Sequence, residues 1–161
     1  MVEVVDVIDE NDVVIGQVTR DELYRKKLSH RIVHVLVFNK NNQILLTKSC
    51  ATKPFNPKTW GTSAGGHVQA GEATEQAAKR ELREELGIQT NINLIGKDWF
   101  ETLLQQRKCI SVFKTTCEGP FVPNNDEIEK VAFMSLTDVR SLISGTESVT
   151  AELMWVLQRF F

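Results

Sequence analysis

GGHVQAGEATEQAAKRELREELGI, residues 65–88, contains the most regular helical pattern in this sequence. Residues 73–86 are rich in Ala, Glu, Leu, Lys and Arg, which all favour the α-helix. Gly87 follows at the point where a helix prefers a left-handed C-terminal residue. Ala78, Leu82 and Leu86 are spaced four residues apart and therefore share one apolar stripe. The pattern predicts a helix over 73–86 that packs on the core through this stripe.

Three glutamates of this helix, Glu81, Glu84 and Glu85, fall on one edge beside the apolar stripe. Glu81 and Glu85 form a like-charged i, i+4 pair, which destabilises a helix by a few tenths of a kcal/mol. One interpretation is a solvated acidic face. The other is a site for a hard divalent cation, because Mg²⁺ and Mn²⁺ prefer oxygen ligands and are held by a few carboxylates together with substrate phosphates.

Glycines stand just before the same helix, at Gly65, Gly66 and Gly71. Without a side chain, glycine lets the backbone approach a ligand closely, and the amides at the start of a helix can face an anion. An acidic helix that follows a glycine-rich loop favours the second interpretation, a site for a metal ion and a phosphate group.

The spacing of these residues resembles the signature of the Nudix hydrolase family. That signature requires Gly, five residues, Glu, seven residues, then Arg-Glu-apolar-any-Glu-Glu-any-Gly-apolar. Here Gly66 and Glu72 are followed by RELREELGI at residues 80–88, so every fixed position matches without a gap. The resemblance implies an α/β (α+β) fold, the Nudix-type α/β/α sandwich with a mixed sheet between helices. It also implies hydrolysis of a nucleoside diphosphate linked to another moiety.

The resemblance also assigns roles position by position. It implies a divalent-metal cofactor, Mg²⁺ or Mn²⁺, bound by the side chains of Glu81, Glu84 and Glu85 and the carbonyl of Gly65. Glu72 and Arg80 would pair and orient the helix that carries these ligands. The metal would neutralise the diphosphate and the charge that develops while water attacks phosphorus.

A general base must also activate the water. Our candidate is Glu127, which lies in an acidic segment just before a predicted strand; a solvated acidic turn is the alternative for this residue. Glu84 and Glu85 are the competing candidates for the catalytic base. Lys48 and Lys53 lie where related proteins contact diphosphate, and with His67 they complete the predicted substrate-binding residues.

The signature over residues 66–88 is called the Nudix box. Segments that extend beyond it resemble the Nudix branch that includes type 1 isopentenyl-diphosphate isomerase, among them SHRIVHVLVFN at 29–39 and KTWGTSAGGH at 58–67. The isomerase needs a cysteine two residues before the loop histidine, where this chain has Gly65. It also uses glutamates in a later strand, where residues 105–108 are QQRK. Isomerase chemistry is therefore disfavoured. A non-catalytic nucleotide-binding module is the second alternative.

Three histidines are open to two interpretations. His30 and His67 match histidine positions of that branch, where they could contact metal or phosphate. The alternative, which we favour, is that His30 and His67 lie in loops and hydrogen-bond to the backbone. His34 lies in an apolar run and is predicted to be a hydrogen-bonded core or edge residue.

The whole chain of 161 residues is predicted to be one Nudix hydrolase domain, 1–161, with a β-hairpin and short helix over 1–28 as an N-terminal extension. Alternating and β-branched runs predict strands, and apolar periodicity predicts two C-terminal helices. The strands are 3–9, 13–18, 33–38, 43–48, 92–95, 109–115 and 130–134, the helices are 137–143 and 150–161, and the loops are 51–59 and 97–108.

Composition limits the partners and the compartment. A net charge of −2 argues against duplex nucleic acid as a partner, and no apolar run reaches the roughly 18 residues of a membrane helix. The N-terminus lacks signal-peptide organisation and the three cysteines lack metal-type spacing, so we expect a cytoplasmic protein. The resemblance to the Nudix family implies a small-molecule diphosphate as its partner. The apolar C-terminal segment could pack within the domain or form a homodimer.

Overall fold

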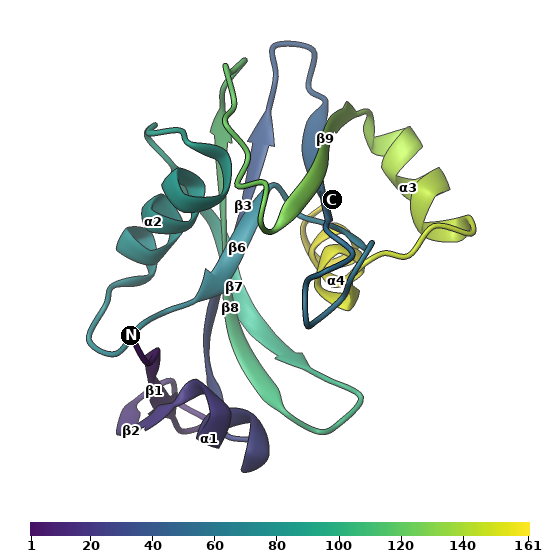
Figure 1. Cartoon of the computed structure of the whole chain (residues 1–161). Helices are drawn as coiled ribbons and strands as arrows, with labels where there is room; N and C mark the ends of the chain where they lie inside the picture. Colours follow the sequence, from purple (N-terminus) through teal and green to yellow (C-terminus); the bar gives the residue numbers. More distant parts are fainter.

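The computed structural model describes residues 1–161, and its nine strands form one mixed sheet. Helices cover both faces: α2 lies on one side, and α3 and α4 lie on the other (Figure 1). The predicted fold class, a mixed sheet between helices, is confirmed. The strands are β1 (Val4–Ile8), β2 (Val14–Thr19), β3 (His30–Phe38), β4 (Ile44–Ser49), β5 (Trp60–Gly61), β6 (Ala64–His67), β7 (Asn93–Glu101), β8 (Arg107–Thr116) and β9 (Ile128–Met134), and the helices are α1 (Arg20–Arg25), α2 (Thr74–Leu86), α3 (Leu136–Ser144) and α4 (Ala151–Phe160).

Strand β3 is the centre of the sheet. It pairs with β8 in parallel along its whole length and with β6 in antiparallel register, in which His34 lies opposite Gly65. The strands predicted at 33–38 and 43–48 are present as β3 and β4, but the two pair only at Phe38 and Ile44. Beyond this point β4 pairs with β5 and β9 instead. Because β3 and β4 diverge, the sheet opens between them.

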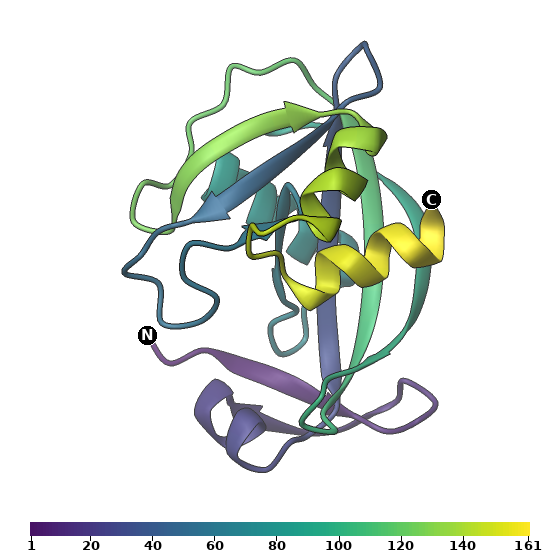
Figure 2. The ribbon, with the colours of Figure 1, turned by 90° about the vertical axis from the view of Figure 1, so that its right-hand side faces the viewer.

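The core has two main parts, one on each face of the sheet, because successive side chains of a strand point to opposite faces. Val33, Val35 and Val37 of β3 pack with the apolar stripe of α2, and the predicted burial of Ala78, Leu82 and Leu86 is confirmed. Ile32 and Leu36 pack with α3 and α4. Figure 2 shows α3 and α4 in front of the sheet and α2 behind it.

The N-terminal extension supports the loop that leads into α2. The short helix predicted within 1–28 is α1, and Thr19 caps it, because its hydroxyl accepts a hydrogen bond from the Glu22 amide at 3.3 Å. Strand β1 pairs with β3 and bridges to Gln69. The buried Asp6 carboxylate accepts a hydrogen bond from the Gly71 amide at 3.0 Å. Strand β1 therefore holds the glycine-rich segment in place.

The predicted loop 97–108 is wrong over much of its length. Strand β7 continues to Glu101 and β8 begins at Arg107, so a short turn joins a long hairpin. Within β7, Asp98 forms an ion pair with Arg159 of α4 at 2.6 Å. This partner, distant in the sequence, accounts for the charge within a strand. None of the helices is both long and apolar enough to cross a bilayer.

Candidate active site

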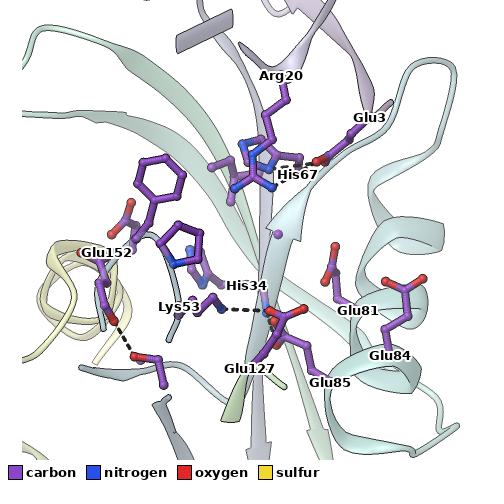
Figure 3. A pocket seen from close by; sticks show the side chains of 18 of the residues that line it. Glu3, Arg20, His34, Lys53, His67, Glu81, Glu84, Glu85, Glu127 and Glu152 are labelled. Carbon is purple, nitrogen blue, oxygen red and sulfur yellow. Dashed lines mark hydrogen bonds and ion pairs between the residues drawn. The ribbon is translucent and has the colours of Figure 1, made fainter. Parts of the chain in front are cut away.

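A cavity of about 1040 Å³ opens where β3 and β4 diverge, and it reaches from α2 to α4 (Figure 3). The acidic edge of α2, defined as Glu81, Glu84 and Glu85, lines it together with Gly65 and Gly66 of β6. The side chain of Glu81 is 12% exposed and that of Glu84 is 52% exposed. The acidic edge therefore borders an enclosed space at Glu81 and meets solvent at Glu84.

Arg80 connects the acidic edge to the loop before α2. Its guanidinium donates two hydrogen bonds to the Glu72 carboxylate, at 2.9 and 3.0 Å, and one to the His67 carbonyl at 2.9 Å. It also contacts Glu81 at 2.7 Å and Glu84 at 3.2 Å. Glu72 and Glu81 raise the pKa of Arg80, with the hydrogen bond to Glu72 making the largest contribution. One guanidinium thus fixes the start of α2 and partly neutralises its acidic edge.

Glu85 is the carboxylate least compensated by positive charge. Its Oε2 accepts a hydrogen bond from the Gly65 amide at 3.2 Å, a contact that the sequence did not indicate. Burial, reinforced by the charge of Glu81, raises the pKa of Glu85 to about 8, although Lys53 acts in the opposite direction. Burial also raises the pKa of Glu81 despite its contact with Arg80. The ionised forms of Glu81 and Glu85 are therefore disfavoured in the cavity unless a positive charge compensates them.

The acidic edge fits a hard divalent cation by the chemistry of its donors. All three side chains offer carboxylate oxygen to one cavity, and a cation would relieve the repulsion between Glu81 and Glu85. No three His, Cys, Asp or Glu side chains converge closely enough to hold an ion as they stand. Arg80 holds Glu81 and Glu84, while the Gly65 amide holds Glu85. Cation binding would therefore require the carboxylates to rotate.

Gly66 allows the Glu81 carboxylate to lie directly against the backbone of β6. A β-carbon at this position would overlap the carboxylate, which is the flexible end of the Glu81 side chain. We expect Gly66→Ala to leave the fold intact but to displace the carboxylate and lower kcat by about 10- to 100-fold, because small misplacements of catalytic groups are costly. Steady-state kinetics and a thermal melt measure both effects. Gly16→Ala is the control, because a β-carbon there meets open space; equal kinetics for the two variants would contradict this role of Gly66.

Glu127 and Lys53 lie in the same cavity and form an ion pair at 3.0 Å. The negative charge of Glu127 contributes to the raised pKa of both Glu81 and Glu85, so its carboxylate lies near the acidic edge. Figure 3 shows Glu127 and Glu85 side by side. The structure thus brings the predicted base and one predicted substrate lysine together with the acidic edge, although Glu127 comes from a segment about 40 residues beyond it.

Lys48 does not line the cavity, so the structure does not bring it together with Lys53 and the acidic edge as its predicted role requires. Its ammonium pairs with Glu147 at 2.9 Å and lies 5.7 Å from the centre of the Trp60 ring. The reason is strand alternation: Thr47 and Ser49 line the cavity, and Lys48 between them points to the other face of β4. Trp60 itself is buried.

His67 lines the cavity, but both of its ring nitrogens already have partners. Nε2 lies 2.8 Å from the Tyr24 hydroxyl and Nδ1 lies 3.5 Å from the Glu3 carboxylate. The ring stacks on His30, with 5.3 Å between centroids. Burial, with the charge of nearby basic groups, lowers the pKa of His67 to about 3. His30 bonds to the Leu28 carbonyl as expected, but both histidines lie in strands and not in loops.

The far end of the cavity contains polar residues that the sequence did not single out. Lys108 of β8 and Glu152 of α4 meet there, beside His34 and Thr62. The expectation that His34 would be fully hydrogen-bonded is wrong, because its Nε2 is buried and has no partner. A lysine beginning an apolar strand and a glutamate in an apolar helix were the available signals. They lie 44 residues apart, and only the fold shows that they meet.

Comparisons with known proteins agree with this geometry. The family model described as NUDIX domain matches residues 28–154. An uncharacterized Nudix hydrolase of Yersinia pestis is 33% identical over 83% of this chain and 74% of its own length. A protein of Photorhabdus laumondii named isopentenyl-diphosphate Delta-isomerase 2 is 28% identical over 92% of this chain and 86% of its own. A crystal structure from Deinococcus radiodurans is 25% identical and superimposes with a TM-score of 0.87, covering 99% of both chains.

Proposed function

This chain belongs to the Nudix family of hydrolases that act on pyrophosphate bonds, and we propose that it is a divalent-metal-dependent diphosphohydrolase for a nucleoside diphosphate derivative. One observation carries this proposal: the carboxylates of Glu81 and Glu85 are crowded in a cavity where their pKa values are raised. Neighbouring carboxylates whose ionised forms are disfavoured by burial gain from a bound cation, which in turn attracts phosphates.

The roles of the side chains follow from their positions. Glu81, Glu84 and Glu85 would hold Mg²⁺ or Mn²⁺, which when bound supplies positive charge to the diphosphate oxygens and to the charge that develops in the transition state. Arg80, tied to Glu72 and to the His67 carbonyl, fixes the orientation of α2. Lys53 lies in the cavity and adds a positive charge that an anionic substrate can approach.

Glu127 is our candidate for the base that accepts a proton from the attacking water. Its carboxylate lines the cavity and is held by Lys53 at 3.0 Å. A substrate phosphate that displaces the Lys53 ammonium would free the carboxylate to bind the water. Glu84, which is partly exposed, and Glu85 are the competing candidates for the base.

Isomerase chemistry receives no support from the site. None of the three cysteines lines the cavity: Cys109 is buried in β8, and the Cys50 thiol donates to the Asn125 carbonyl. The residue that lies two positions before His67 is Gly65. The likeness to a named isomerase therefore concerns the fold and the flanking segments, while the acid that would protonate an alkene is missing.

A substrate panel tests the proposed function. The purified protein is incubated with nucleoside di- and triphosphates, nucleoside diphosphate sugars, dinucleoside polyphosphates and isopentenyl diphosphate, with Mg²⁺ or Mn²⁺ and with a chelator. ³¹P NMR of the products identifies which bond is broken. We expect cleavage of a diphosphate linkage that stops with the chelator.

Two results would contradict the proposal. The first is no cleavage of any compound with either metal, combined with tight ligand binding that needs no metal, which would favour a binding module. The second is migration of the double bond of isopentenyl diphosphate without release of phosphate, which would favour the isomerase.

A further inference from the structure

The end of the cavity that faces α4 is built around a buried ion pair. The Lys108 ammonium lies 2.8 Å from the Glu152 carboxylate, and their side chains are only 10% and 17% exposed. Lys108 comes from β8 and Glu152 from the first turn of α4. Figure 3 shows Glu152 on the opposite side of His34 from the acidic edge of α2. The cavity therefore has two polar ends with different charge.

The α4 end is close to neutral overall, because one cation and one anion compensate each other. Burial acts to raise the pKa of Glu152, but the charge and hydrogen bond of Lys108 outweigh it and hold this pKa below its ordinary value. Glu152 is therefore ionised at neutral pH and cancels the charge of Lys108. A phosphate group gains little from such a pair, whereas Lys53 and a cation on the acidic edge would attract it. The diphosphate belongs at the α2 end.

Groups at the α4 end have hydrogen-bonding capacity that the protein leaves unused. The Lys108 ammonium has three N–H groups and makes one hydrogen bond. His34 Nδ1 lies 2.7 Å from the Thr62 hydroxyl oxygen, and that hydroxyl donates its one proton to the Ala64 carbonyl at 3.2 Å. We therefore assign the imidazole proton to Nδ1, which leaves Nε2 as a bare acceptor. This Nε2 is the buried atom without a partner.

Stability does not account for these groups. A buried ion pair gains little net free energy over apolar side chains of similar volume, because both charges lose their hydration. A buried acceptor without a partner is unfavourable. Polar groups that are costly to bury, and that line a cavity beside a reaction site, are typical of ligand recognition.

We propose that Lys108, Glu152 and His34 form a recognition subsite for the uncharged part of the substrate. The ligand group would present a hydrogen-bond acceptor to the Lys108 ammonium and donors to the Glu152 carboxylate and to His34 Nε2. The amide or amino edge of a nucleobase has this chemistry, and so does a set of sugar hydroxyls. The inference rests on the proposed hydrolysis of a nucleoside diphosphate derivative and names the residues that select its uncharged moiety.

Gly65 connects this subsite to the acidic edge. Its amide donates to Glu85, and a β-carbon on it would lie 2.7 Å from His34 Nδ1. The His34 ring therefore packs against the same backbone segment that holds Glu85. A substrate with its diphosphate at the α2 end would extend past Gly65 toward Lys108.

The test is the selectivity of the double variant Lys108→Met/Glu152→Gln, which removes both charges without leaving one of them buried alone. Three substrates are compared: a nucleoside diphosphate, a nucleoside diphosphate sugar and methyl diphosphate, which has neither base nor sugar. We expect kcat/KM to fall about 10- to 100-fold for the substrate whose uncharged group occupies the subsite, and less than about twofold for methyl diphosphate. If kcat/KM falls for both the nucleoside diphosphate and the nucleoside diphosphate sugar, the subsite binds the base. If kcat/KM falls for the nucleoside diphosphate sugar alone, the subsite binds the sugar.

A matched control separates recognition from a general effect of removing an ion pair. Arg31→Met breaks the ion pair between Arg31 and Asp12. The side chain of Arg31 is 20% exposed and that of Asp12 is 17% exposed, and both residues lie outside the cavity. This variant should keep the parent's selectivity. Unchanged selectivity in the double variant, or an equal loss on all three substrates, would overturn the inference.

Binding in the absence of metal distinguishes failure of the subsite from failure of the proposed hydrolysis. Calorimetry measures the affinity of the parent and the double variant for the uncharged nucleosides and for free sugars. If the parent hydrolyses nothing but binds one of these compounds, and the double variant does not, the subsite stands and the hydrolysis fails. If the parent hydrolyses diphosphates and the double variant keeps its selectivity and affinity, the hydrolysis stands and the subsite fails.

Discussion

Glu85→Gln is expected to lower kcat by about 10³-fold or more while the protein stays folded. The substitution keeps the size of the side chain and removes one of the buried charges that would hold the cation, so it acts on electrostatic stabilisation, which is commonly the largest part of catalysis. Its fold should be at least as stable as that of the parent, because the side chain is buried and its ionised form is disfavoured there. Steady-state kinetics on the best substrate, with a thermal melt of the same preparation, measure both effects.

Glu75→Gln provides the matched control for this prediction. Glu75 lies on the same helix, pairs with Lys79 at 2.6 Å and is 58% exposed, outside the cavity. An exposed ion pair of this kind adds little stability, so the variant should have parent-like activity and melting temperature. If Glu85→Gln retained the parent's turnover, the assignment of the acidic edge to catalysis would be wrong.

Without a divalent metal, the protein should lose stability as the pH rises from about 6.5 to about 8. The pKa of Glu85 is raised in the folded state to about 8, so in this window the folded protein holds a proton that the unfolded chain has already released. The free energy of unfolding therefore falls, by about 2 kcal/mol over the window. Denaturant unfolding in the presence of a chelator measures it at each pH.

The three buried histidines set the lower limit of this window. Burial lowers the pKa of His30 and of His34 to about 4 and that of His67 to about 3. The unfolded chain binds their protons below about pH 6.5, so their contribution makes stability rise with pH and is complete by that point. The fall above pH 6.5 should disappear in Glu85→Gln. It should also disappear in the parent with saturating Mg²⁺; an unchanged fall in either case would contradict the prediction.

The acidic edge could be predicted from the sequence because its members lie within one helix. Helical periodicity is local, so the positions of Glu81 and Glu85 relative to the buried Leu82 follow from spacing alone. The Nudix box adds the role of Arg80, whose partner Glu72 is eight residues away. The helix that carries Glu81 and Glu85, and the contact between Arg80 and Glu72, are both present in the structure.

Other parts of the site depend on pairings that no local pattern shows. Lys48 and Lys53 are both predicted to bind substrate because related proteins contact diphosphate at these positions. Alternation in β4 turns Lys48 away from the cavity, while Lys53, in the following loop, points into it. Lys108 and Glu152 meet only because β8 and α4 pack together. The same dependence on distant partners hid the extension of β7, where Asp98 pairs with Arg159.

The most direct test of the central claim is a titration of the protein with Mn²⁺, followed by electron paramagnetic resonance in the presence of a non-hydrolysable nucleoside diphosphate analogue. The parent and Glu75→Gln should bind the ion with the same affinity, and Glu85→Gln should bind it at least about 10-fold more weakly, because a charged oxygen ligand has been lost. Equal affinity in all three proteins, or no binding by the parent, would contradict the account.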